Sequence, residues 1–214
     1  MDEDLTIIEE NTRKERIKIF FIKHKKKIYF LMSLILLTTF STFFYLDGVK
    51  KKRAEIANEF ITASINYDKN KKAYYLKKFN EIINSNHSTY APLALFFLVD
   101  NKVLKSNEEI NHLFDKVLND ANLEKEIKNL LIYKKALINA DFEPENVMVE
   151  ILKPIINSES FWKPHSLLLL GDYFLFKGEK LKAKDFYSQI LTSKITNKNI
   201  FSQAQLRIQR NYGE

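Results

Sequence analysis

The stretch "LLLLGDYFLFKGEKLKAKDFY", residues 167–187, decides the fold of this chain of 214 residues. It holds two of the four glycines, Gly171 inside an apolar run and Gly178 at its end. A glycine in a helix interior costs about 1 kcal/mol relative to alanine, so Gly171 needs a structural reason. Close approach of a second helix is such a reason, and Gly178 then supplies the turn. The stretch therefore predicts a tight helix pair over 163–177 and 180–193.

The rest of the chain after residue 46 has the same helical character. Only four glycines and four prolines occur in the whole sequence, and 45% of the residues are hydrophobic, which favours an all-α fold. Amphipathic periodicity, with joints of two to six residues, predicts antiparallel neighbouring helices. The predicted helices cover 50–67, 70–84, 89–104, 107–120, 124–139, 144–156, 163–177, 180–193 and 199–210. The helix over 89–104 is expected to open with a Ser-Thr cap and Pro92 in its first turn.

The N-terminal part contains a different signal. Residues 28–46, "IYFLMSLILLTTFSTFFYL", are nineteen residues without a charge and would span about 28 Å as a helix. Tyr29 and Tyr45 lie near the two ends, where aromatic rings suit a membrane interface. A buried core helix is one alternative, which the densely charged flanks oppose. A cleaved signal peptide is the other, which the missing small-residue cleavage site opposes. We therefore expect a transmembrane signal anchor over 28–46.

Basic residues on the two sides of this segment predict its orientation. Residues 1–27 carry eight lysines and arginines, whereas only Lys50, Lys51, Lys52 and Arg53 follow closely on the other side. The positive-inside rule then makes 1–27 a cytoplasmic tail and places 47–214 outside. The tail is expected to be either a short interfacial helix or mostly disordered. Both basic clusters are also suited to anionic lipid headgroups.

The opening stretch resembles the tetratricopeptide repeat, a helix pair with an L-G-x-x-Y…A-x-x-x-F core. The residues that carry the match, and the packing that it implies, are Leu170, Gly171, Phe174, Gly178, Ala183 and Tyr187. Any tight helical hairpin with glycine in its turn is the alternative. Residues 90–121 and 129–156 match more loosely, and 129–156 places Tyr133 where a small residue is expected. Because one pair cannot bury its own apolar face, we expect 47–214 to form a TPR-like α-solenoid of about four antiparallel helix pairs.

A candidate partner groove follows from this resemblance. Repeat solenoids bind extended or helical segments on the face that the first helix of each pair lines. On the repeat over 163–193 that face is predicted to include His165, Leu168, Asp172 and Leu175. In the alternative arrangement, neighbouring helices cover Leu168 and Leu175.

The order of parts, together with "YAPLALFFLVDNKVL" and "FWKPHSLLLLGDYFLFKGEKLKAKDFYSQIL", resembles the YfgM-like ancillary subunits of the bacterial SecYEG translocon. The resemblance implies a scaffold that is anchored in the bacterial inner membrane, with its repeat domain in the periplasm. The partners that it implies are translocon subunits, periplasmic chaperones and translocating chains. A second hypothesis is a structural or regulatory membrane protein whose helical domain oligomerises in an envelope or division complex.

Sequence features of an enzyme are missing. The chain has no cysteine, and His24, His87, His112 and His165 form no metal-binding spacing. No dinucleotide-binding, P-loop or nucleophile-elbow motif occurs. The net charge of +7 comes with lysine runs beside the apolar segment, which a membrane explains better than nucleic acid does. We therefore expect no catalysis, metal, cofactor, small-molecule substrate or nucleic acid.

Overall fold

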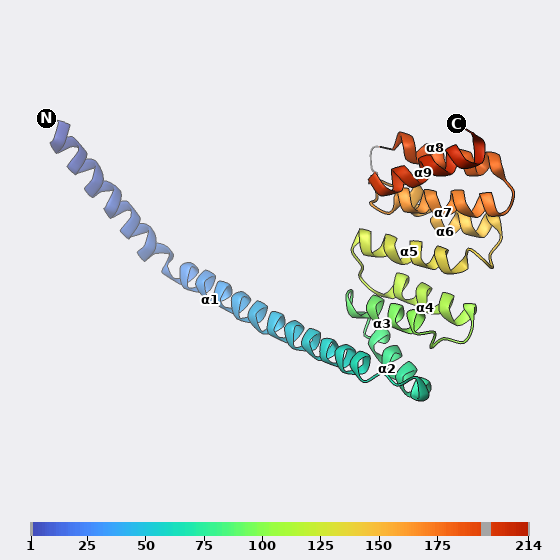
Figure 1. Cartoon of the computed structure of the whole chain (residues 1–214). Helices are drawn as coiled ribbons and strands as arrows, with labels where there is room; N and C mark the ends of the chain where they lie inside the picture. The colour runs from blue at the N-terminus through green and yellow to red at the C-terminus, as the bar shows by residue number, and fades with distance from the viewer. Residues whose placement is uncertain (1, 194–197, 214) are drawn as a thin grey trace. The chain divides into compact units, whose positions relative to one another are not determined.

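The computed structural model describes residues 2–193 and 198–213, and over these residues the fold is entirely helical, as predicted (Figure 1). The chain divides into two units, Met1–Glu55 and Ile56–Glu214, which are described separately. Helix α1, Asp2–Ile65, makes up the first unit and contributes its last residues to the second. The described part of the predicted tail over 1–27 is thus part of this helix. The prediction of a separate helix over 50–67 is wrong at its start, because α1 continues without a break through residue 50.

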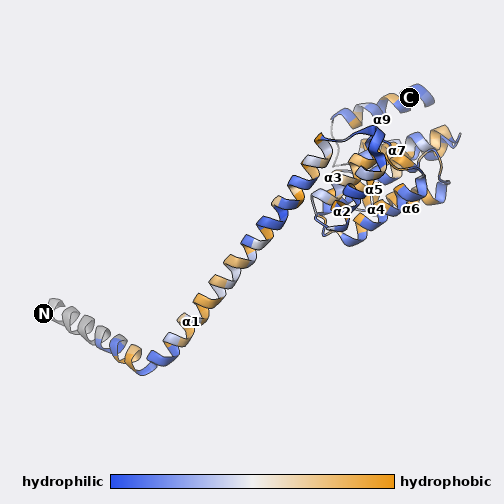
Figure 2. Cartoon of the chain, turned by 90° about the horizontal axis from the view of Figure 1, so that it is seen from below, coloured by the Kyte–Doolittle hydropathy of each residue, from blue (hydrophilic) through white to orange (hydrophobic). Residues whose placement is uncertain are grey.

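In the first unit, the apolar part of α1 has no partner within the described structure. It is long and apolar enough to cross a membrane, and none of its apolar window is buried. Figure 2 shows it as a hydrophobic stretch between two hydrophilic ones. The hydroxyls of Thr38, Thr39 and Thr42 each donate to a backbone carbonyl one turn earlier, at 2.6 to 3.0 Å. Threonine hydroxyls that are hydrogen-bonded in this way leave no unpaired donor in apolar surroundings.

The second unit is a series of helices that pack in sequence order, each on the next. Contacts also join α5 to α7 and α7 to α9, so alternate helices lie side by side (Figure 1). After the end of α1, the elements are η1 (Lys69–Lys71), α2 (Lys72–Asn84), α3 (Tyr90–Asp100), α4 (Asn107–Asp120), α5 (Lys125–Asn139), α6 (Glu145–Ile156), α7 (Lys163–Phe176), α8 (Lys180–Thr192) and α9 (Lys198–Tyr212).

Local capping chemistry explains where several helices begin and end. The Ser106 hydroxyl accepts from the N–H of Glu109 at 3.2 Å, and the Glu109 carboxylate accepts from the N–H of Lys105 at 2.9 Å. This arrangement resembles a capping box and starts α4 at the predicted residue. The Ser-Thr cap expected for α3 is wrong, because Thr89 makes no side-chain cap bond. Instead His87 Nδ1 accepts from the N–H groups of Thr89 and Tyr90, at 3.1 and 3.4 Å.

The core of the second unit falls into two clusters of buried apolar side chains. The first runs from Ile56 to Leu131 and the second from Ile132 to Ile208. The boundary lies within α5, whose adjacent residues Leu131 and Ile132 belong to different clusters. Leu118 is half-buried and packs against both. Each cluster is therefore built from helices that are neighbours in sequence.

Candidate functional site

The packing of the α7–α8 pair centres on Gly171. A Cβ built at this position would lie less than 3.0 Å from three ring atoms of Tyr187, whose side chain is fully buried. Leu170, Phe174 and Ala183 are buried in the same cluster. Gly171 thus occupies the place where the α8 tyrosine ring crosses α7, and a side chain there would need the ring to move.

Gly178 closes the turn between these two helices. Its φ is +82°, a conformation that residues with a Cβ rarely adopt. The N–H of Gly178 donates to the Leu175 carbonyl at 3.1 Å, and the N–H of Glu179 donates to the Phe174 carbonyl at 2.9 Å. These bonds form a Schellman-type ending that reverses the chain into α8.

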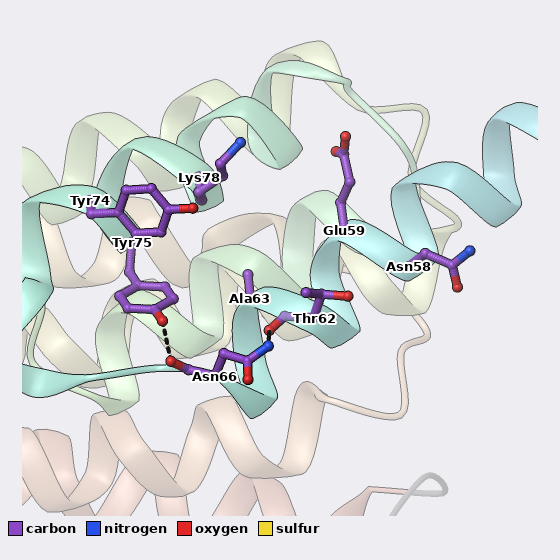
Figure 3. A pocket seen from close by; sticks show the side chains of 8 residues that line it. All are labelled: Asn58, Glu59, Thr62, Ala63, Asn66, Tyr74, Tyr75 and Lys78. Atoms are coloured by element: carbon purple, nitrogen blue, oxygen red, sulfur yellow. Dashed lines mark hydrogen bonds between the residues drawn. The ribbon is translucent and has the colours of Figure 1, made fainter.

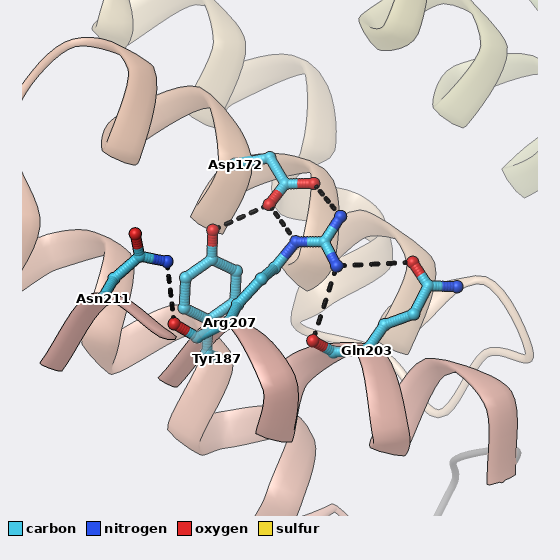
Figure 4. A network of polar contacts seen from close by, with 5 residues as sticks. All are labelled: Asp172, Tyr187, Gln203, Arg207 and Asn211. Carbon is cyan, nitrogen blue, oxygen red and sulfur yellow. Dashed lines mark hydrogen bonds and ion pairs between the residues drawn. The ribbon is translucent and has the colours of Figure 1, made fainter. Parts of the chain in front are cut away.

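A polar network joins α9 to this pair (Figure 4). Asp172 on α7 accepts from the Tyr187 hydroxyl at 2.7 Å and forms a two-pronged ion pair with the Arg207 guanidinium on α9. Arg207 also donates to the backbone and side chain of Gln203, and its own carbonyl accepts from Asn211 at 2.8 Å. Bidentate pairing of this kind fixes geometry as well as contributing energy, so α9 is held at a defined position on α7.

Two pKa values reflect this network. The hydrogen bond from Arg207 to Asp172 raises the pKa of the guanidinium, although partial burial opposes it. Burial raises the pKa of Tyr187, and its hydrogen bond to Asp172 acts in the same direction. Both groups therefore keep their protons over the physiological range. Asp172 serves here as the acceptor that connects three helices.

The structure arranges the predicted groove residues differently from the prediction. Leu168 is 8% exposed and belongs to the core, and Leu175 is half-buried against the same cluster. The alternative in which neighbouring helices cover these two leucines is therefore the one found. The exposed stripe of α7 is shifted by one residue, to the half-buried Leu169 and the exposed Phe176. Helical spacing places both on the same face as His165 and Asp172.

His165 lies in an aromatic cluster at the start of α7. Its ring is 5.1 Å from Trp162, 5.7 Å from Phe161 and 6.1 Å from Tyr133, and Tyr133 stacks on Trp162 at 5.5 Å. Burial lowers the pKa of His165, and a hydrogen bond with the Phe161 backbone opposes this only partly. The cluster joins α5 to α7 where the looser repeat carries Tyr133 in place of a small residue.

An apolar groove lies between α3 and α5, at positions that the sequence had not predicted as a groove. It has a volume of about 350 Å³. Its apolar lining residues are Pro92, Leu93, Phe96, Ile127 and Leu130, and its polar ones are Ser88, Thr89 and Glu124. Leu93 and Ile127 are 40% and 39% exposed, high for aliphatic side chains that face a neighbouring helix. Both helices are the first members of their predicted pairs, the class of helix expected to line the binding face.

Charge at this groove is sparse. Glu124 is the one charged residue in its lining, and Lys134 on α5 places its Nζ 5.5 Å from the centre of the Phe96 ring. A mainly apolar lining with two hydroxyls and a single charge suits a polypeptide segment better than a charged polymer.

A second cavity, of about 420 Å³, lies between the end of α1 and α2 (Figure 3). Polar side chains contribute to its lining, among them Asn58, Glu59, Thr62 and Lys78. The Tyr75 hydroxyl donates to the Asn66 carbonyl, and the Asn66 amide donates to the Thr62 carbonyl at 2.9 Å. These bonds are local to the wall and rigidify the cavity.

The histidines do not assemble into a chemical site. His87 caps α3, His165 lies in the aromatic cluster, and His112 is exposed on α4. Among the described residues, no group of three His, Asp or Glu side chains is placed to hold a metal ion.

The sequence did not predict two features of the structure, the Asp172–Arg207 ion pair and the α3–α5 groove, for identifiable reasons. The ion pair from Asp172 to Arg207 spans 35 residues, a separation at which helical periodicity carries no information. The α3–α5 groove was missed although "APLALFFL" is unusually apolar for a helix of eleven residues. That excess of apolar residues, beyond one buried face, was the available signal.

No family model, no curated protein and no solved structure matches the chain.

Proposed function

We propose that the protein is a membrane-anchored scaffold that binds segments of other proteins through a TPR-like helical domain. Residues 28–46 act as a signal anchor in a bacterial inner membrane, with the tail in the cytoplasm and the helical domain on the periplasmic side. The activity that we propose for the protein is binding, with no chemical step. Translocon subunits and periplasmic chaperones are the specific partners that the resemblance implies.

The observation that carries this proposal is the α3–α5 groove. Its exposed leucine and isoleucine, beside Phe96, provide apolar surface that water would otherwise cover. The groove lies on first helices of pairs, where repeat domains take extended or helical segments. The anchor is supported by the apolar part of α1, which is not buried within the described structure and which is flanked by basic residues.

Site-specific photocrosslinking in bacterial cells tests the proposal on the full chain. A photoreactive amino acid replaces Leu93 or Ile127 in separate variants, and Glu150, exposed on α6, serves as the matched control. We expect crosslinks to a translocon subunit or a chaperone from 93 and 127 and none from 150.

Three other outcomes would overturn the proposal. Equal crosslinking from 150 would mean that the groove is not selective. No crosslink from either groove position would mean that it is unoccupied. Crosslinks only to a second copy of this chain would replace the scaffold with the oligomerising envelope protein.

A further inference from the structure

The turn between α7 and α8 exposes two large apolar side chains at one place. Phe176 and Leu181 are 83% and 85% exposed, the two most exposed large apolar side chains among the described residues. Single exposed apolar residues are ordinary on protein surfaces. Here two of them flank one four-residue turn, and this turn with its two apolar side chains, which water hydrates unfavourably, is called the tip.

This tip is held in place by the fold. The Schellman-type bonds at Gly178 and Glu179 fix the backbone of the turn. The Tyr212 hydroxyl on α9 donates to the Lys180 carbonyl at 2.6 Å, which ties the turn to the last helix. Phe176 and Leu181 are therefore presented by a rigid support.

The charge of the turn itself is positive. Lys177 and Lys180 are exposed within it, and Lys182 pairs with Glu145 at 2.6 Å and with Glu179 at 3.7 Å. Over residues 177–180 two lysines stand against the single carboxylate of Glu179, so the turn carries net positive charge. Aromatic and aliphatic side chains next to lysines are the combination by which peripheral elements enter the headgroup region of an anionic bilayer.

The neighbouring turn between α5 and α6 provides a comparison. The two turns lie on the same side of the helix array (Figure 1), and the Tyr173 hydroxyl donates to the Glu143 carbonyl at 3.0 Å. Phe142 in that turn is also exposed, but Asp141 and Glu143 flank it. Carboxylates at this place disfavour an anionic surface, so a lipid contact fits the α7–α8 turn alone.

We infer that the α7–α8 turn is a second membrane-contact site, which inserts Phe176 and Leu181 into the headgroup region of an anionic bilayer while Lys177 and Lys180 meet the phosphates. This inference goes beyond the binding of protein partners, and the proposed contact site is separate from the basic residues that flank 28–46. It rests on the proposed membrane anchoring, which vesicle flotation tests independently.

The full chain is suited to a direct test because it has no native cysteine. Single cysteines at 176, 181 and 161 are labelled with an environment-sensitive fluorophore and reconstituted in phosphatidylcholine vesicles with or without phosphatidylglycerol. Phe161 is the matched control, because it is exposed and apolar but precedes α7, about 22 Å from Phe176 at helical rise. Nitroxide-labelled lipids then report contact with the bilayer by quenching.

We expect emission from 176 and 181 to shift to the blue and to rise about two-fold in phosphatidylglycerol vesicles, with quenching by the nitroxide lipids. Label at 161 should keep the emission that it has in detergent. Replacing Lys177 and Lys180 by glutamine should reduce the signal at 181, and so should Phe176→Ser.

Equal signals at 161 and 181, or no change from detergent at 181, would overturn the inference. A signal at 181 that is as strong without phosphatidylglycerol would overturn the role of the lysines. Emission that grows with the protein-to-lipid ratio would assign the tip to a second copy of the chain instead.

Discussion

Replacement of Gly171 by alanine should destabilise the protein, although glycine is the poorer helix former. The new Cβ would lie less than 3.0 Å from three atoms of the Tyr187 ring. That ring is fully buried, and its hydroxyl is bound to Asp172 at 2.7 Å. It therefore has no free direction in which to move, so relief displaces the ring and breaks the hydrogen bond.

The size of the effect follows from opposing contributions. Alanine gains about 1 kcal/mol in helix propensity over glycine. Overpacking a filled site costs about 1 to 3 kcal/mol. Loss of a hydrogen bond to a charged acceptor costs about 1.5 to 3 kcal/mol more. The net loss in the free energy of unfolding is about 1.5 to 5 kcal/mol, so Tm should fall by about 3 to 20 °C for a domain of this size.

Thermal unfolding of the full chain in detergent measures this change. Trp162 is the only tryptophan and stacks on Tyr133, so its emission reports the separation of α5 from α7. Gly171→Ala is compared in the wild-type and Tyr187→Leu backgrounds, because the smaller side chain removes the ring that the Cβ meets. A higher Tm for Gly171→Ala, or the same cost in both backgrounds, would refute the close approach as the reason for this glycine.

Two further predictions concern α9 and His165. Arg207→Gln should cost about 1 kcal/mol, since the pair with Asp172 is partly exposed, and should speed amide hydrogen exchange in α9. Arg210→Gln, an exposed change on the same helix, should leave exchange unchanged, and equal effects of the two would contradict a specific tie. Burial lowers the pKa of His165 below its usual 6.5, so the folded state binds fewer protons there and Tm should fall as the pH drops from 7.5 to 5.5. His165→Gln should flatten that dependence, and an unchanged slope would exclude His165 as its source.

The helices were predictable because local chemistry determines their positions. Ser106, Gly178 and the joints between the amphipathic stretches mark the ends of helices within a few residues of where the structure has them. The largest difference is the helix predicted over 50–67, which does not begin at 50 but continues from the preceding residues of α1. Among the other boundaries the end of α3 differs most, four residues before the predicted one. There Lys102 adopts a positive φ of 51°, a conformation that a lysine at this position does not predict.

The face that each helix presents was less predictable, and the leucine run shows why. In 167–170 all four positions are leucine, so composition does not tell which side chain points outward. A helix turns about 100° per residue, and an error of one position therefore exchanged the buried Leu168 for Leu169. The membrane span, its orientation, the partners and the absence of catalysis stay predictions.

The division of the core within α5 bears on how the chain folds during synthesis. Every buried member of the first cluster lies between Ile56 and Leu131, and every buried member of the second follows it; of the half-buried side chains packed on the first cluster, only Ile138 comes later. Ile208, the last member of the second cluster, lies 77 residues after Leu131. At about 5 to 20 residues per second this interval lasts about 4 to 15 s, far longer than helix pairs need to form. The nascent chain can thus bury its first apolar surface early. Only the helices of the second cluster must wait for residues that are synthesised later.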